Sequence, residues 1–341
     1  MSATLTVVQA GPALSIQDFG RTGYRAQGLT RGGAADPIAL HEGAALLRQS
    51  AGAAIEMIGA GGTFTSDTDL RIALTGAAMT ANIDGAAIVW NASHLLPAGA
   101  KLTIGGATGG TYGYLHIGGG LATPELMGSR SSHLSAGLGA ALKSGDTLAI
   151  GPDKGSETGM ALPRDNRFDG GTVHVVESMQ TVHFNADTRA RFTRTTFRRD
   201  PRANRQGVRM DSDGEGFFSD GQLSIVSEVI VQGDIQITGD GAPFVLMCES
   251  QTTGGYPRIA TVLPADLPRI AQAPAGAAIR FAFVSLEEAI AIEKRAAAEL
   301  TALPGKRYPL VRNPAEMRDL LSYQLIGGAV SANANPFEEG T

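Results

Sequence analysis

Short apolar or alternating segments, separated by turns of glycine, aspartate and asparagine, recur in two blocks of the chain. Apolar runs of about four to eight residues between such turns are typical of β-strands. The predicted strands of the first block lie at 3–8, 70–75, 86–90, 101–104, 112–117 and 147–150. Those of the second block lie at 172–176, 222–226, 235–238, 243–248, 258–262 and 278–284. The chain is therefore predicted to be mainly β.

Three local signals predict helices. Asp36 followed by Pro37 is an N-cap with proline at the first helical position, and it predicts a helix extending to about residue 48. Ser285 and Glu288 form a capping box for a helix reaching about residue 300. Asn313-Pro314 predicts a short helix over 314–325, and residues 331–341 are expected to be disordered.

The polar segment 152–171, rich in glycine, proline and aspartate, is the best candidate for a linker. It divides the chain into predicted domains at 1–160 and 161–300, followed by a partly helical extension at 301–341. A weak internal repeat relates 61–100 to 233–277. Two related modules of short strands favour closed or nearly closed barrels, with a ligand cleft between them.

Composition excludes several classes of protein. The 341 residues carry a net charge of −5, which provides no basic field for nucleic acid or an anionic membrane. No apolar run approaches the roughly 20 residues of a membrane-spanning helix, and no signal peptide is apparent. The single cysteine, Cys248, lies in an apolar run and is predicted to be a packing residue. We expect a cytoplasmic protein that binds neither nucleic acid nor membrane.

Several familiar catalytic and cofactor motifs are missing. Gly305-Lys306 lacks the first glycine and the hydroxyl of a phosphate-binding loop, and no glycine cluster has dinucleotide-binding spacing. The six histidines are scattered, so no metal site is predicted. There is no G-x-S-x-G elbow and no Ala-Met-Lys-Met segment for biotin attachment. We expect no covalently bound cofactor; ATP or biotin, if used, would come from another polypeptide.

Two polar loops in the first block are candidate sites. Gln17, Asp18 and Arg21 lie in a glycine-bracketed loop, where a guanidinium can bind a planar amide or carboxylate through two donors. An internal Asp–Arg ion pair is the alternative. Residues 128–132 bring Ser129, Arg130 and backbone amides together, which suits a carboxylate or oxyanion. A serine-rich turn is the alternative there.

A third candidate follows the apolar run 243–248. It contains Gln251, Thr252, Thr253, Gly254, Gly255 and Tyr256, followed by Pro257. Adjacent glycines allow a ligand to approach the main chain, and polar loops at the ends of buried strands often carry binding residues. The alternative is a tight turn whose hydroxyls cap its own backbone. Asp36 likewise has two interpretations, a helix cap or a catalytic acid.

Taken in order, these stretches resemble the biotin-dependent carboxyltransferase family, also called allophanate hydrolase subunit 2. The resemblance covers about residues 5 to 290. Its motifs are Gln17-Asp18-x-Gly20-Arg21-x-Gly23-Tyr24, Gly32-Gly33-Ala34-Ala35-Asp36, Gly128-Ser129-Arg130-Ser131, Asn204-x-x-Gly207-x-Arg209, and Gln-Thr-Thr-Gly-Gly-Tyr-Pro at 251–257 followed by Ile259-Ala260. The run at 251–257 is the most specific of these.

This resemblance implies two cyclophilin-like β-barrel domains with a substrate cleft between them. It implies a partner of the allophanate hydrolase subunit 1 (KipI-like) type, possibly with a third subunit. The family includes the third (C) subunit of prokaryotic 5-oxoprolinase, which acts in ATP-dependent opening of 5-oxoproline to glutamate. It also includes domains of urea carboxylases that move CO2 from carboxybiotin to urea. KipA, another member, represents a third possibility, a non-catalytic regulator that binds a KipI-like partner.

The resemblance also suggests roles for individual residues. Arg21 and Arg130 are expected to hold a substrate carboxylate or amide oxygen, and Asp18 to orient Arg21 or act as a base. These three residues are the predicted catalytic set. Predicted to contact the substrate are Gln17, Asp36, Ser129, Gln251, Thr252, Thr253, Gly254, Gly255 and Tyr256.

The chain departs from the family pattern at several charged positions. Members usually have Asp where this chain has Asn204, and Arg where it has Ser250. The pairs Gly43-Ala44 and Arg48-Gln49 replace a usual Ala-Asn and Gly-Asn. A lost charged contact can cost about 1.5–3 kcal/mol. An altered substrate or weakened catalysis is therefore expected.

Overall fold

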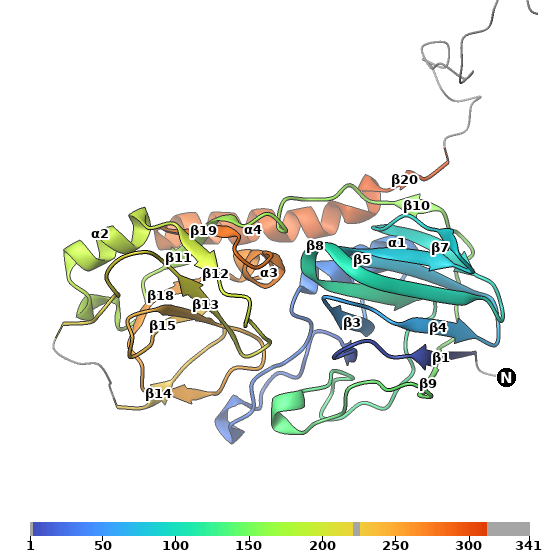
Figure 1. Ribbon diagram of the computed structural model, residues 1–341, viewed down its shortest axis with the longest axis horizontal. Coiled ribbons are helices and arrows are strands. Elements are labelled where there is room, and N and C mark those ends of the chain that lie inside the picture. Colours follow the sequence, from blue (N-terminus) through green and yellow to red (C-terminus); the bar gives the residue numbers. More distant parts are fainter. Residues whose placement is uncertain (1–2, 221–225, 312–341) are drawn as a thin grey trace, which may run out of the picture.

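The computed structural model describes residues 3–220 and 226–311, which form two β units side by side (Figure 1). In these residues the first unit is an eleven-stranded sheet and the second is a closed seven-stranded barrel. The prediction of a mainly β protein with a few helices is confirmed. The helices are α1 (Pro37–Leu47), α2 (Ala186–Arg194), α3 (Leu267–Gln272) and α4 (Leu286–Ala302), with short 3-10 turns η1 (Arg25–Gln27), η2 (Leu134–Ala136), η3 (Thr181–His183), η4 (Pro264–Asp266) and η5 (Leu303–Lys306).

The first sheet is dominated by two long antiparallel strands, β5 and β8. Its strands are β1 (Thr4–Gln9), β2 (Ser15–Gln17), β3 (Ala54–Ile58), β4 (Thr63–Ser66), β5 (Leu70–Ile83), β6 (Ala86–Ala87), β7 (Ala92–Leu96), β8 (Lys101–Ile117), β9 (Thr147–Ala149), β10 (Met160–Ala161) and β20 (Tyr308–Pro309). The main path runs β20-β10-β7-β5-β8-β4-β1-β9, with β2 on β3, β3 on β8, and β6 on β5.

One strand boundary was predicted incorrectly. Segments 101–104 and 112–117 are not two strands but parts of the single strand β8. The glycines between them were interpreted as a turn. Instead they let the strand bend while it stays paired with β5, whose register shifts three times between Gly76 and Ala81. Similarly, only Ala86–Ala87 of the predicted strand 86–90 is extended and paired.

The second unit surrounds a core of aromatic rings. Its strands are β11 (Gly171–Val176), β12 (Phe197–Arg199), β13 (Gly207–Asp211), β15 (Asp234–Ile237), β16 (Pro243–Leu246), β18 (Arg258–Val262) and β19 (Ala278–Phe283). Phe192 of α2 stacks on Phe281 with centroids 5.0 Å apart and packs against Phe197 and Phe217. β14 (Glu228–Val229) and β17 (Thr253–Gly254) form a separate pair at the rim. Most of the predicted strand 222–226 lies outside the described residues.

The end of the described chain returns to the first unit. Helix α4 leaves the barrel after the predicted Ser285–Glu288 capping box, which is present, and runs along both units (Figure 1). Beyond η5, β20 pairs with β10, and β10 pairs with β7 of the first sheet. The 301–341 extension therefore contributes a strand to the first unit. The helix predicted at 314–325 and the tail lie outside the described residues.

Helix α1 starts as predicted, with Asp36 as N-cap accepting a hydrogen bond from the Ile38 amide. Midway along the helix, Gly43 faces the buried imidazole of His116, which bonds to the Thr75 hydroxyl at 2.7 Å. Burial lowers the pKa of His116 to about 3, so the ring is neutral. Glycine at position 43, where family members usually have alanine, thus leaves room for a buried histidine.

Replacing Gly43 with alanine is expected to destabilise the protein, although alanine normally favours a helix. A Cβ at this position would lie 2.3 Å from the His116 ring. Overpacking of this kind costs about 1–3 kcal/mol, against about 1 kcal/mol gained in helix propensity. Urea unfolding of Gly43→Ala and of Gly43→Ala/His116→Ala tests this. Equal stability of Gly43→Ala and the parent protein would contradict it.

No helix in the described part of the chain is both long and apolar enough to span a membrane.

Candidate functional site

Asp18 joins the first two motif loops. One carboxylate oxygen accepts from the Gly20 amide at 2.8 Å, the Ser129 hydroxyl at 2.6 Å and the Ser131 hydroxyl at 2.5 Å. The other accepts from the Arg130 amide at 2.7 Å. Burial alone would raise the pKa of Asp18, but these four hydrogen bonds outweigh it and lower the pKa. Asp18 is therefore an ionised anchor for residues 128–131.

Arg21 and Gln17 lie beneath these loops rather than at a surface. The Arg21 guanidinium is buried and donates to the carbonyls of Ser131 and Leu126. Asp18 and Arg21 form no ion pair in the described part of the chain, and the orienting role expected of Asp18 stays a prediction. Gln17 is fully buried and donates to the Ser15 hydroxyl and the Ser132 carbonyl. In this conformation both side chains support the loop.

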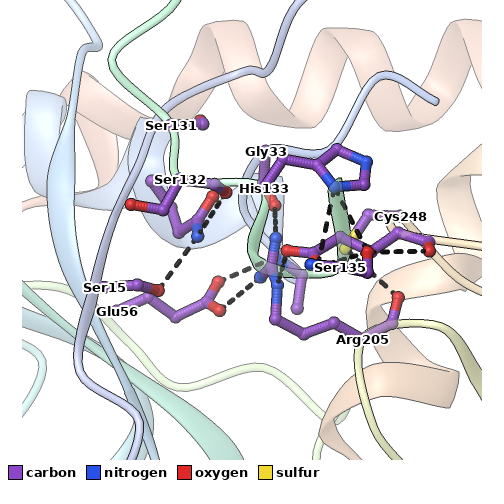
Figure 2. A network of polar contacts seen from close by, with 12 residues as sticks. Ser15, Gly33, Glu56, Ser131, Ser132, His133, Ser135, Arg205 and Cys248 are labelled. Atoms are coloured by element: carbon purple, nitrogen blue, oxygen red, sulfur yellow. Dashed lines mark hydrogen bonds and ion pairs between the residues drawn. The ribbon is translucent and has the colours of Figure 1, made fainter. Parts of the chain in front are cut away.

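A buried ion network connects this region to the barrel (Figure 2). Arg205, from the loop before β13, contacts Glu56 of β3 at 2.5 Å, Glu249 at 2.6 Å and the Gly33 carbonyl at 2.5 Å. Glu56 is fully buried, and its second oxygen accepts from the Ala35 amide and from a tyrosine hydroxyl. The network lies at the interface between the two units, beside the motif loops.

His133 belongs to this region, although nothing in its spacing selected it among six scattered histidines. The Thr30 hydroxyl donates to the Ser250 carbonyl, so its oxygen accepts from His133 Nε2 at 2.9 Å. The Ser135 hydroxyl lies 3.2 Å from His133 Nδ1 and donates to the Glu249 carboxylate at 3.0 Å, and the Ser135 amide donates to the same carboxylate at 3.2 Å. Burial lowers the pKa of His133 despite the nearby Glu249 carboxylate. His133 and Ser135 thus link Thr30 to Glu249 at the edge of the ion network.

The 251–257 loop reaches the same region only through the two residues that precede it, Glu249 and Ser250. Thr253 and Gly254 form β17, and the Thr252 carbonyl accepts from the Ile230 amide. Gln251, Thr253 and Tyr256 are exposed at the barrel rim, with Tyr256 at 43%. The turn between β17 and β18 includes Gly255. The structure thus brings the residues before this loop to the other motifs and leaves Gln251, Thr253 and Tyr256 exposed.

Asp36 is fully buried between the two units. Besides capping α1, it accepts from Arg167 at 2.8 Å and from Gln272 of α3 at 2.8 Å. Arg167 also forms a two-pronged ion pair with Glu42 at 2.9 and 2.7 Å. The cap interpretation describes the observed position of Asp36, which has no solvent-facing surface. Its role in substrate binding stays a prediction.

A cavity of about 670 Å³ opens beside Asp18. Its wall includes Asp18, Gly20, Gly128 and Arg130 of the motif loops, whereas Arg21 does not line it. The Arg130 side chain donates to the Leu121 carbonyl and pairs with Glu125. The remaining wall comes mainly from α1 and the loop after it, from β5, from the end of β8 with the turn after it, and from the segment 152–155, all within the first unit.

The same cavity contains residues that motif reasoning missed, namely Arg48, Arg71 and Lys154. The unusual Arg48-Gln49 pair was the available signal for the first of them. With Arg130, these cations give the cavity the chemistry of a site for a small anionic or amide ligand. Among the described residues no group of three or more His, Cys, Asp and Glu side chains could hold a metal ion.

A second cavity, of about 500 Å³, lies between the units. It is bounded by α1, residues 163–165, the η4–α3 segment and α4. Most of its surface is apolar, with prolines and alanines prominent, including Pro37, Pro163 and Pro268. It contains none of the predicted site residues.

Comparisons with known proteins agree with the motifs. Residues 27–283 match the family model described as carboxyltransferase domain, subdomain A and B. The chain is 35% identical over 292 residues to the C subunit of 5-oxoprolinase from Escherichia coli, covering 84% of this chain and 93% of that protein. It is 24% identical to urea amidolyase of Saccharomyces cerevisiae, covering 89% of this chain but 18% of that protein.

Comparison with solved structures agrees with the sequence matches. The crystal structure of TTHA0988 superposes with a TM-score of 0.74 at 28% identity, over 82% of this chain and 56% of that one. This chain thus spans about half of that solved protein. The family match, the relatives and the fold are consistent with one another, and the chain belongs to the carboxyltransferase domain family.

Proposed function

We propose that this chain is the C-type subunit of an ATP-dependent amide-processing enzyme that, with partner subunits, opens 5-oxoproline to L-glutamate. The similarity to the C subunit of 5-oxoprolinase along almost its whole length carries the proposal. The cation-lined cavity beside Asp18 supports it, because 5-oxoproline presents both a cyclic amide and a carboxylate.

The reaction sets the demands on the site. Ring opening breaks the amide C–N bond, adds oxygen from water to the carbonyl carbon, and leaves the nitrogen protonated. ATP would be bound and used by the assembled complex and supplies the driving force. In this chain, the Arg130 side chain lines the cavity and would hold the developing oxyanion once it exchanges its exposed partner Glu125 for the ligand.

The partners belong to the proposal too. A KipI-like subunit of the allophanate hydrolase subunit 1 type is the expected partner, with a third subunit possible. Exposed Gln251, Thr253 and Tyr256 at the barrel rim would contact the amide or the partner once the complex has formed. We expect the chain alone to have no turnover.

The direct test mixes the purified subunits with ATP and 5-oxoproline and measures glutamate release with this chain present or omitted. Release is expected only when the chain is present. Equal release without it would refute the assignment. A tight complex without turnover would instead support the KipA-like regulator.

Carboxyl transfer from carboxybiotin on a separate carrier to urea or a related amide is the second candidate. The family model's description and the similarity to urea amidolyase favour it. Supplying a biotinylated carrier, biotin carboxylase, bicarbonate and urea distinguishes it. Carboxylation of urea that requires this chain, with no glutamate release from 5-oxoproline, would select this candidate.

A further inference from the structure

Arg48 occupies a backbone conformation that arginine rarely adopts. It is the C-cap of α1, with φ 51° and ψ 50°, in the left-handed region where glycine is the usual residue. Strain of this kind costs about 1–3 kcal/mol and is often found at functional sites. Arg48 also lines two cavities: the one beside Asp18, and another of about 670 Å³ against η5.

The charges around the cavity beside Asp18 are unevenly paired. Arg71 is held by Asp153 at 2.6 Å and by two carbonyls, and Arg130 is paired with Glu125. The Asp18 carboxylate is saturated by its four donors. These wall charges are therefore already neutralised or fully hydrogen-bonded.

Two cations of the same wall have no close anionic partner of their own. Arg48 reaches only Glu157, at 3.8 Å, and Glu157 is already bonded by Arg307 at 2.6 Å. The side chain of Lys154 makes no ion pair with any described residue and is exposed. The cavity therefore has a cationic excess located at Arg48 and Lys154, on the wall formed by the end of α1 and segment 152–155.

We propose that Arg48 and Lys154 form an anion subsite that selects an amide substrate carrying a carboxylate over a neutral one. The guanidinium would take the carboxylate through two donors, and the ammonium would contribute a point charge. This deepens the proposed function, on which it rests, because it places the carboxylate of 5-oxoproline at the end of α1. It also excludes urea as the preferred ligand of this cavity.

The test is calorimetric binding to the full chain, using three probes that separate the contributions. 5-Oxoproline has the ring amide and the carboxylate, pyrrolidin-2-one has only the ring amide, and glutarate has only carboxylates. The variants are Arg48→Asn, which tolerates the left-handed backbone, Lys154→Gln and their combination. Lys143→Gln, an exposed cation away from the cavity, is the matched control.

Carboxylate binding is expected to weaken roughly tenfold in each single variant and further in the double variant, with pyrrolidin-2-one and the control unchanged. Arg48→Gly should raise the thermal midpoint while weakening carboxylate binding, since it removes both the strain and the charge. A merely structural arginine would not produce this opposite pair of changes.

Three results would overturn the subsite: parent-like carboxylate binding by the double variant, no carboxylate binding by the parent protein, or weakened binding of a partner subunit with ligand binding unchanged. The experiments distinguish failure of the anion subsite from failure of the proposed function. If 5-oxoproline binds the parent and the double variant equally, the subsite fails and the proposed function stands. If glutarate binding needs Arg48 but the complex never opens 5-oxoproline, the subsite stands and the function fails.

Discussion

Replacing Arg205 with alanine is expected to lower the free energy of unfolding by about 3–5 kcal/mol. The substitution leaves Glu56 and Glu249 buried without their shared cation and removes the bond to the Gly33 carbonyl. The effect comes from uncompensated buried charge, because the ion pair itself contributes little beyond the cost of desolvating it. Urea unfolding of the full chain, monitored by circular dichroism, measures this loss of stability.

The matched control is Arg198→Ala, whose partner is the exposed Asp213. An exposed pair contributes about 0–1 kcal/mol, so this variant should unfold almost like the parent. Adding Glu56→Gln and Glu249→Gln to an Arg205→Met variant should recover part of the loss, since no buried charge is then left unpaired. Similar losses in Arg205→Ala and Arg198→Ala would contradict the buried-charge explanation.

Replacing Asp18 with asparagine is expected to reduce turnover of the assembled complex about 100-fold, the loss that a displacement of about 1 Å can cause. The NH2 group of the asparagine side chain would face one of the four donors that now bond to the carboxylate. Two donors cannot bond to each other, so residues 128–131 would move. Stability should fall by about 1.5–3 kcal/mol, the contribution of a hydrogen bond to a charged group. Glutamate release and urea unfolding measure the two effects, with Asp213→Asn as control. Parent-like turnover would remove Asp18 from the site.

The pH dependence of stability provides a separate check on Asp18. Its folded-state pKa lies below the usual 3.8. The stabilisation is therefore present above the unfolded-state pKa and is lost as pH falls through the lowered folded-state pKa. Asp18→Asn removes this titration, so the stability difference between parent and variant should shrink on acidification below about pH 4. A difference that stays constant to low pH would mean that the Asp18 bonds do not depend on its charge.

The sequence was most informative where the signal is local. Helices α1 and α4 were predicted because Asp36-Pro37 and the Ser285–Glu288 capping box lie within a few residues of the backbone groups they satisfy. The bend of β8 was missed because glycine permits both a turn and a kinked strand. Only pairing with β5, decided by tertiary packing, separates these two outcomes.

The candidate site could not be predicted from local signals, because its residues are far apart in the sequence. Asp18 and Ser129 are 111 positions apart, and Arg205 and Glu56 are 149 apart, so residue spacing could not pair them. The family resemblance selected Asp18, Ser129 and Arg130 together, and the structure shows them in contact. It could not show that Arg21 and Asp36 are buried, because burial depends on how the two units pack.

Because the chain returns to its first unit, cleavage of the polypeptide between the units is not expected to separate them. A single proteolytic cut in the exposed segment 152–155 would split the polypeptide in two. The second fragment would nevertheless keep β10 and β20, which belong to the first sheet, and would still lie against α1 through η5. The nicked protein is expected to show two bands under denaturing conditions and to elute as one intact particle in gel filtration.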